Sequence, residues 1–211
     1  WLQDNNYGHV YYNDIEPKIF EAKIYDPSTA DPDIYPGGYA TLLVGGMRFG
    51  GGKIATDLDK EDGAYNSSVD TVMSSAYYIL DITNPEAPPK VLAEITFPDL
   101  GFTTCYPAVT TIRNRVYTSG VGATMSDNEW YLVFGSGPAS PDASGNDGAN
   151  TDALINGTSS QQAVMYAIDL VKLAQNGELW TITNSGKKKY TPTDSGPYYL
   201  TQLPEANSSV S

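Results

Sequence analysis

The sequence contains one cysteine and one histidine among its 211 residues. Cys105 therefore closes no disulfide within these residues, and no haem-attachment motif exists. Its neighbours Phe102 and Tyr106 favour a buried free thiol, and a bridge to a segment outside this chain is the alternative. His9 lies in a Gly-rich and Tyr-rich segment, which favours a structural or solvent-facing role. A Ser-His-Asp or Cys-His catalytic arrangement is therefore not expected, and neither is an enzyme.

Basic residues are also scarce. The chain has 12 Lys and Arg residues against 25 Asp and Glu residues, which gives a net charge of −13. Such a surface repels duplex nucleic acid and anionic lipid, so no nucleic-acid partner is expected. The one basic run, 187–189, is expected to form a solvated turn. No stretch approaches the roughly 18 apolar residues of a membrane-spanning helix, so no membrane span is expected in this chain.

Helical periodicity is weak throughout, with a faint signal only around 163–173. The 20 Gly and 14 Pro residues interrupt the chain at short intervals. Between them lie runs of Val, Ile, Leu, Tyr, Thr and Phe that are typical of β-strands. The sequence therefore predicts an all-β protein.

The strand runs form two sets with the same internal order. The first set is 17–25, 39–46, 76–82 and 90–96, and the second set is 107–112, 130–137, 164–170 and 178–183. Matching landmarks lie about 90 positions apart, as from Pro17 to Pro107 and from Tyr78 to Tyr166. Two copies of a four-stranded unit are therefore predicted.

A repeated four-stranded antiparallel unit is typical of a β-propeller blade. We expect blade-like repeats at about 14–97 and 106–184, and the start of a further unit at about 197–211. Long loop insertions, 47–75 and 138–163, lengthen each repeat beyond the roughly 40 to 50 residues of a usual blade. Since a ring typically takes about four to eight blades, the rest of the propeller is expected from residues outside this chain.

The motifs of both repeats resemble those of the PilY family of type IV pilus tip-associated adhesins and assembly factors. In the first repeat these are Leu-Val-Gly-Gly (43–46), Gly-Gly-Gly (50–52) and Tyr-Ile-Leu-Asp-Ile-Thr-Asn-Pro (78–85). In the second they are Phe-Gly-Ser-Gly (134–137) and Met-Tyr-Ala-Ile-Asp-Leu (165–170). Strands of the Tyr-x-x-Asp-Leu type also recur in quinoprotein-type propellers. The resemblance therefore implies a fragment of a quinoprotein-like β-propeller with two four-stranded antiparallel blades.

The same resemblance implies a non-catalytic cell-surface or pilus-tip protein that acts in type IV pilus biogenesis and adhesion. Its implied location is extracellular, at the pilus tip or the outer membrane, and its implied partners are minor or major type IV pilins and surface ligands. The family's von Willebrand-like adhesion module and its aspartate-rich calcium loop do not occur in this sequence. Two alternatives stay open: a propeller module that binds a ligand or carbohydrate, and a quinoprotein-like oxidoreductase.

Two acidic loops are candidates for a calcium site, because Ca²⁺ takes six to eight oxygen ligands. Asp57, Asp59 and Glu61 are the best candidate ligands, since alternate residues of an extended stretch point the same way. A second acidic stretch is 142–152. Neither loop has EF-hand spacing, and a solvated acidic loop is the alternative for each. Calcium is the one candidate cofactor.

Two pairs of residues are expected to be equivalent in the repeats. Asp81 and Asp169 end matching strands, and their carboxylates are expected to accept hydrogen bonds from backbone N–H groups of the following turns. Leu80 and Ile168 precede them and are expected to pack between the sheets.

Overall fold

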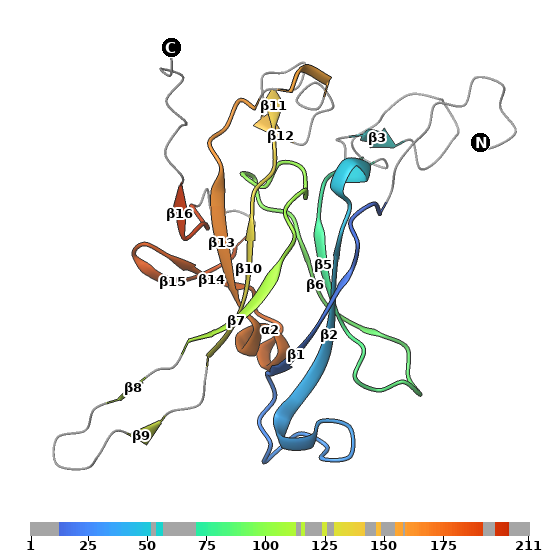
Figure 1. Cartoon of the computed structure of the whole chain (residues 1–211), viewed down its shortest axis with the longest axis vertical. Helices are drawn as coiled ribbons and strands as arrows, with labels where there is room; N and C mark the ends of the chain where they lie inside the picture. Colours follow the sequence, from blue (N-terminus) through green and yellow to red (C-terminus); the bar gives the residue numbers. More distant parts are fainter. Residues whose placement is uncertain are drawn as a thin grey trace, which may run out of the picture.

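The computed structural model describes residues 13–51, 54–56, 71–112, 115–116, 124–125, 129–141, 147–148, 155–157, 159–191 and 197–202. Antiparallel sheets dominate this part of the chain, so the predicted all-β class is confirmed. The helices are short: η1 is Pro36–Gly38, η2 is Arg48–Gly51 and α2 is Leu170–Asn176. Figure 1 shows two main sheets side by side, with α2 near the lower end where they approach each other.

The first sheet has four antiparallel strands whose order follows the chain. They are β1 (Lys18–Lys23), β2 (Tyr39–Gly46), β5 (Tyr77–Asp81) and β6 (Lys90–Ile95). The four strands predicted for the first repeat are therefore confirmed. A small hairpin of β3 (Ile54–Thr56) and β4 (Thr71–Met73) occupies the predicted insertion between β2 and β5.

The second sheet contains the four predicted strands of the second repeat and two more. The predicted four are β7 (Ala108–Ile112), β10 (Glu129–Gly135), β13 (Val164–Asp169) and β14 (Trp180–Thr183). The additional strands are β15 (Gly186–Lys189), which pairs with β14, and β16 (Thr201–Gln202), which pairs with β13. The second unit is thus larger than a four-stranded blade.

The strand β15 corrects the prediction of a solvated turn at the lysine run. The turn lies just before it, at 184–185, and Lys187 pairs with Ile182 in the register of a hairpin. Lysine is compatible with an edge strand because its charged end reaches solvent or a carboxylate while its aliphatic stem covers the sheet.

Further short hairpins leave the second sheet. One, β11 (Ser140–Pro141) with β12 (Asp147–Gly148), lies in the predicted insertion between β10 and β13. Another, β8 (Arg115–Val116) with β9 (Thr124–Met125), joins β7 to β10 and was not predicted. The described residues 197–202 join the second sheet through β16, and a further unit that begins at about 197–211 stays a prediction.

The backbone register aligns the two repeats. In the first sheet Leu43 lies opposite Leu80, and in the second sheet Leu132 lies opposite Ile168. In both sheets an aspartate follows and ends the strand. The predicted equivalence of Leu80 and Ile168 is therefore confirmed.

The two sheets nevertheless bury non-equivalent faces where they meet: the face that the first sheet buries corresponds, by strand register, to the outer face of the second. The Tyr77 ring of the first sheet lies 4.6 Å from the Phe134 ring of the second, and Phe134 lies opposite Tyr166. Ile168 shares the buried face of Tyr166, whereas Leu80 alternates with the buried residues of β5 and lies on the outer face, partly buried. The prediction that Leu80 packs between the sheets was wrong, because the sheets stack front to back.

Aromatic rings fill much of the interface between the sheets. Phe97, which follows β6, stacks at 4.8 Å on Tyr166 and at 5.7 Å on Tyr198. At the other end of this cluster the Tyr77 hydroxyl donates to the backbone carbonyl of Cys105. Cys105 is a free thiol of intermediate exposure, so it is less buried than its apolar neighbours suggest.

The difference between equivalent positions gives a direct test of the front-to-back packing. We expect Ile168→Ala to lower the free energy of unfolding by about 2 to 5 kcal/mol, because it leaves a cavity between the sheets. Leu80→Ala, at the equivalent but only partly buried position, is expected to cost about 1 kcal/mol or less. Urea denaturation of both variants measures this difference, and equal losses would contradict the assignment of faces.

Candidate functional site

A cleft of about 360 Å³ opens beside α2, between the end of the first sheet and the second sheet. Its lining includes Tyr25, Glu129, Asp169, Lys172, Gln175 and Lys187. The Gln175 side chain donates a hydrogen bond of 3.0 Å to the carbonyl of Ile24, which ties α2 to the first sheet. The cleft therefore lies where both sheets and the helix contribute polar side chains.

Asp169 directly precedes α2, the helix beside the cleft. This residue ends β13 in an extended conformation, and its Oδ1 accepts a 3.0 Å hydrogen bond from the backbone N–H of Lys172. Asp169 is thus the N-cap of α2, which satisfies one of the free N–H groups of the first turn. Gly177 ends the helix with φ of 66°, a left-handed conformation that favours glycine. The predicted role of Asp169 as an acceptor for the following turn is confirmed.

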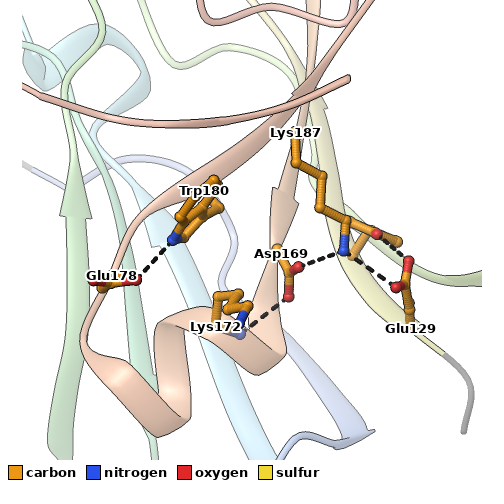
Figure 2. Close-up of polar contacts among 7 residues, drawn as sticks. Glu129, Asp169, Lys172, Glu178, Trp180 and Lys187 are labelled. Atoms are coloured by element: carbon orange, nitrogen blue, oxygen red, sulfur yellow. Dashed lines mark hydrogen bonds and ion pairs between the residues drawn. The ribbon is translucent and has the colours of Figure 1, made fainter.

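Asp169 also takes part in an ion-pair network (Figure 2). The Lys187 ammonium lies 2.9 Å from Asp169 Oδ2 and 3.2 Å from Glu129 Oε1. The Tyr131 hydroxyl donates to Glu129 Oε2, and the Tyr131 ring centre lies 5.5 Å from the ammonium. Three strands, β10, β13 and β15, therefore meet at one lysine.

The protonation of this network follows from its contacts. Burial opposes the charge of Lys187, but its hydrogen bonds with Tyr131 and Asp169 and the negative charge of Asp169 outweigh burial and raise its pKa. Burial, together with the hydrogen bond to Glu129, raises the pKa of Tyr131 to about 12. At neutral pH the amine is an ammonium and the phenol is neutral, so neither group is a base or a nucleophile there. The network can hold strands together or present fixed charge and hydrogen-bond donors to a polar ligand.

A second, more exposed pair lies nearby. Lys189 pairs with Glu178. The Trp180 indole N–H donates a 2.9 Å hydrogen bond to the same carboxylate (Figure 2). The hydrogen bond from Lys189, followed by that from Trp180, lowers the pKa of Glu178. This pair joins β15 to the segment that follows α2.

The equivalent aspartate of the first sheet has different partners. Asp81 accepts hydrogen bonds from the hydroxyls of Tyr25 at 2.9 Å and Tyr35 at 3.0 Å, and from the backbone N–H of Thr83 at 3.0 Å. Burial alone would raise its pKa, but the hydrogen bonds, those from Thr83 first, hold the pKa of Asp81 below its usual value. The predicted turn-stabilising role of Asp81 is confirmed. The hydrogen bonds that its carboxylate accepts here come from uncharged donors.

The predicted calcium ligands Asp57, Asp59 and Glu61 lie outside the described residues, as does His9. Of the second acidic stretch only 147–148 is described, in β12. Among the residues that the structure describes, no group of three His, Cys, Asp or Glu side chains is placed to hold a metal ion. The calcium site in 57–61 stays a prediction.

Sequence reasoning missed the network at Lys187 and Glu129. One signal was present: Asn184, Ser185 and Gly186 are turn-forming residues that directly follow a strand-like run, a composition typical of β-hairpin turns. In a strand, Lys187 and Lys189 then share a face. Glu178 lies only 11 positions before Lys189, next to the first strand of that hairpin. Glu129 could not be found in this way, because it lies 58 positions from Lys187 and the pairing of distant strands brings the two together.

Comparisons with protein-family models, with curated proteins and with solved structures gave no match for this chain. In the described ranges, every helix is too short or too polar to cross a membrane.

The network predicts unequal roles for two lysines on the same strand. We expect Lys187→Met to lower the free energy of unfolding by about 1 to 2 kcal/mol, because the Asp169 side chain is only 5% exposed and loses its cation. The matched control Lys189→Met removes an exposed pair and is expected to change stability little. Thermal and urea unfolding compare the two, and a larger loss for Lys189→Met would contradict the network.

The lowered pKa of Asp81 predicts acid sensitivity. Its stabilising contribution is present above the unfolded-state pKa of about 3.9 and is lost as the pH falls through the lower folded-state value. We expect Asp81→Asn to be less stable than the parent at neutral pH, with the difference shrinking as the pH falls below about 4. Asp33→Asn, at an exposed position, is the control. Urea midpoints measured at each pH give the stability difference between the parent and Asp81→Asn. A difference that does not change with pH would contradict this role.

Proposed function

We propose that this chain is part of a secreted β-propeller of the PilY type, a non-catalytic scaffold in type IV pilus biogenesis and adhesion. The observation that supports this best is the front-to-back stacking of two sheets, in which the four strands of the first match four of the six strands of the second. Blades of a propeller stack in this way around a ring. The motifs 43–46 and 78–85 lie in and after β2 and β5 of the first unit, where the resemblance requires a strand end and a strand with its turn.

The position of the two insertions supports a role in presenting loops to partners. Each insertion joins the second strand of its unit to the third, so both leave equivalent ends of equivalent sheets. In Figure 1, β3 and the hairpin of β11 and β12 both lie at the upper end of the molecule. Loops on a rigid scaffold commonly carry binding functions. Minor or major pilins and surface ligands are the proposed partners, at the cell surface or pilus tip.

The state of the polar residues fits a binding role better than catalysis. Lys187, Glu129 and Asp169 are engaged with one another, and the raised pKa values of Lys187 and Tyr131 favour their protonated forms. A binding module for a small polar ligand or carbohydrate is the second candidate, because the cleft combines the aromatic Tyr25 with donors and acceptors. Sugar sites commonly use such a combination of an apolar ring and fixed polar groups.

A binding experiment separates these functions. The purified chain is immobilised and exposed to sheared type IV pili, to soluble domains of major and minor pilins, and to a panel of monosaccharides. We expect pilin binding that is lost when residues 57–70 are replaced by a Gly-Ser linker of equal length. The double variant Asp57→Asn with Asp59→Asn is expected to abolish any increase in binding or in melting temperature caused by calcium.

The variant in which 57–70 are replaced is interpreted only if its melting temperature equals that of the parent, because this would show that the sheets are intact. Saccharide binding that Tyr25→Ala abolishes, without binding to any pilin, would support the second candidate instead. A folded parent that binds neither pili nor pilins would contradict the proposed role.

A further inference from the structure

Another hollow, of about 550 Å³, lies beside the start of β13, whereas the cleft beside α2 lies at the end of that strand. The turn after β6, the end of the second insertion and the segment of β16 form its walls. Its lining includes Asp99, Ser160, Gln161, Gln162, Tyr199 and Gln202. One carboxylate, three carboxamides, a hydroxyl and an aromatic ring therefore line the same space.

Backbone hydrogen bonds hold these walls together. The N–H of Gly137, just before the second insertion, donates a 2.9 Å hydrogen bond to the carbonyl of Leu100 in the turn after β6. Near the other end of the insertion, the N–H of Ser160 donates a 2.8 Å hydrogen bond to the carbonyl of Ala139. On the opposite side, β16 pairs with the first residues of β13. The hollow is therefore built by the chain itself, and a pre-formed site loses less free energy to ordering when a ligand binds.

Two oxygen acceptors of the lining are suited to a ligand that donates hydrogen bonds. The Gln161 Nε2 donates to the carbonyls of Asp99 at 3.1 Å and of Gly137 at 3.3 Å, which uses both amide donors and leaves the amide oxygen to accept. Partial burial raises the pKa of the Asp99 carboxyl, and no lysine or arginine is among the described residues that line the hollow. A carboxylate in this position favours a donor such as a hydroxyl or an ammonium group and disfavours an anion.

A buried donor lies behind the same wall. Tyr166, whose ring stacks on Phe97, has a buried hydroxyl without a hydrogen-bond partner among the described residues. Burial raises the pKa of this hydroxyl most, and Asp99 and Tyr199 raise it further, so the hydroxyl lies close to two residues of the lining. A buried hydroxyl without a partner is costly, and such groups typically meet a water molecule or a ligand. A polar ligand in the hollow can supply the missing acceptor, directly or through a bridging water.

We propose that this hollow binds a saccharide unit, with Asp99 and the amide oxygen of Gln161 accepting hydrogen bonds from its hydroxyls and the Tyr199 ring packing on its apolar face. Its volume of about 550 Å³ lies within the roughly 300 to 1,000 Å³ of small-molecule sites. A few fixed polar groups around an apolar ring also suit a ligand that carries many hydroxyls. The site lies apart from 57–70, to which pilin binding is assigned, and from Tyr25 in the cleft beside α2. It is therefore an additional site, independent of the proposed pilus role.

The charge of the lining predicts an order of affinity among sugars of the same ring. The probes are a neutral methyl pyranoside, the amino sugar and the uronic acid, each in the gluco and the galacto configuration. We expect the amino sugar to bind most tightly, because its ammonium group adds an attraction to Asp99. The methyl pyranoside is expected to follow, and the uronic acid is expected to bind most weakly, because Asp99 repels its carboxylate. Titrations with millimolar sugar, followed by NMR of the purified chain at a pH below 7, measure this order.

Single variants assign the binding to the hollow. Asp99→Asn keeps the shape of the side chain and removes its charge, so it is expected to weaken binding of the amino sugar about tenfold and to bring it close to that of the methyl pyranoside. Gln202→Ala, at an exposed position on β16, is expected to weaken binding of both sugars alike. Asp33→Asn removes the same charge at an exposed position outside the hollow and is the matched control, with the order of the parent expected. Tyr25→Ala is expected to bind these sugars like the parent.

Three results would overturn the proposal. The first is a folded parent that binds no sugar of either configuration, and the second is a uronic acid that binds as tightly as the methyl pyranoside. The third is binding that Tyr25→Ala abolishes and Asp99→Asn leaves intact, which would place the sugar in the cleft beside α2. Asp99→Asn and Gln202→Ala are expected to melt like the parent, since both positions are exposed. Pilin binding is measured with the replacement of 57–70, so either result can fail without the other.

Discussion

Front-to-back contact between two equivalent sheets is the constraint on which the rest of this structure depends. Tyr77 of the first sheet packs on Phe134 of the second, while the register makes Leu80 and Ile168 equivalent. Two repeats related by a two-fold axis would bury the same face and leave the same face exposed. Here each repeat uses a different face, so the pair has two different outer surfaces. A stack of this kind can be extended or closed into a ring, whereas a two-fold sandwich is complete by itself.

Equivalent aspartates at the strand ends show how the repeats diverge around a fixed backbone role. Asp81 and Asp169 both accept a hydrogen bond from a backbone N–H of the next turn. In the first sheet tyrosine hydroxyls complete the shell of the carboxylate, so a buried charge is satisfied without a cation. In the second sheet Lys187 pairs with the carboxylate of Asp169 and also with that of Glu129. The backbone contact fixes the aspartate, and the remaining oxygen is free to take whichever donor the neighbouring strand supplies.

Strand positions could be predicted from this sequence because they depend on local patterns. Alternating β-branched and aromatic residues between Gly, Pro and Asn marked β1, β2 and β5 almost to the residue. The buried face could not be predicted, since both faces of the first sheet are apolar and alternation alone does not say which one meets a neighbour. The network at Lys187 could not be predicted from the sequence either. Glu129 lies 58 positions away and meets the lysine only through the pairing of β10, β13 and β14.

Antiparallel connectivity separates the two regions that could bind partners. The insertions follow Gly46 and Gly135, the last residues of β2 and β10, and return at the first residues of the next strands. The cleft lies at the other end of those strands, where β13 passes into α2 through Asp169. A substitution in an insertion therefore leaves the ion pairs of the cleft in place, and a substitution in the cleft does not reach the insertions. Because the sheet between them is a rigid hydrogen-bonded ladder, the loops can change in length and charge without disturbing the stacking that sets their position.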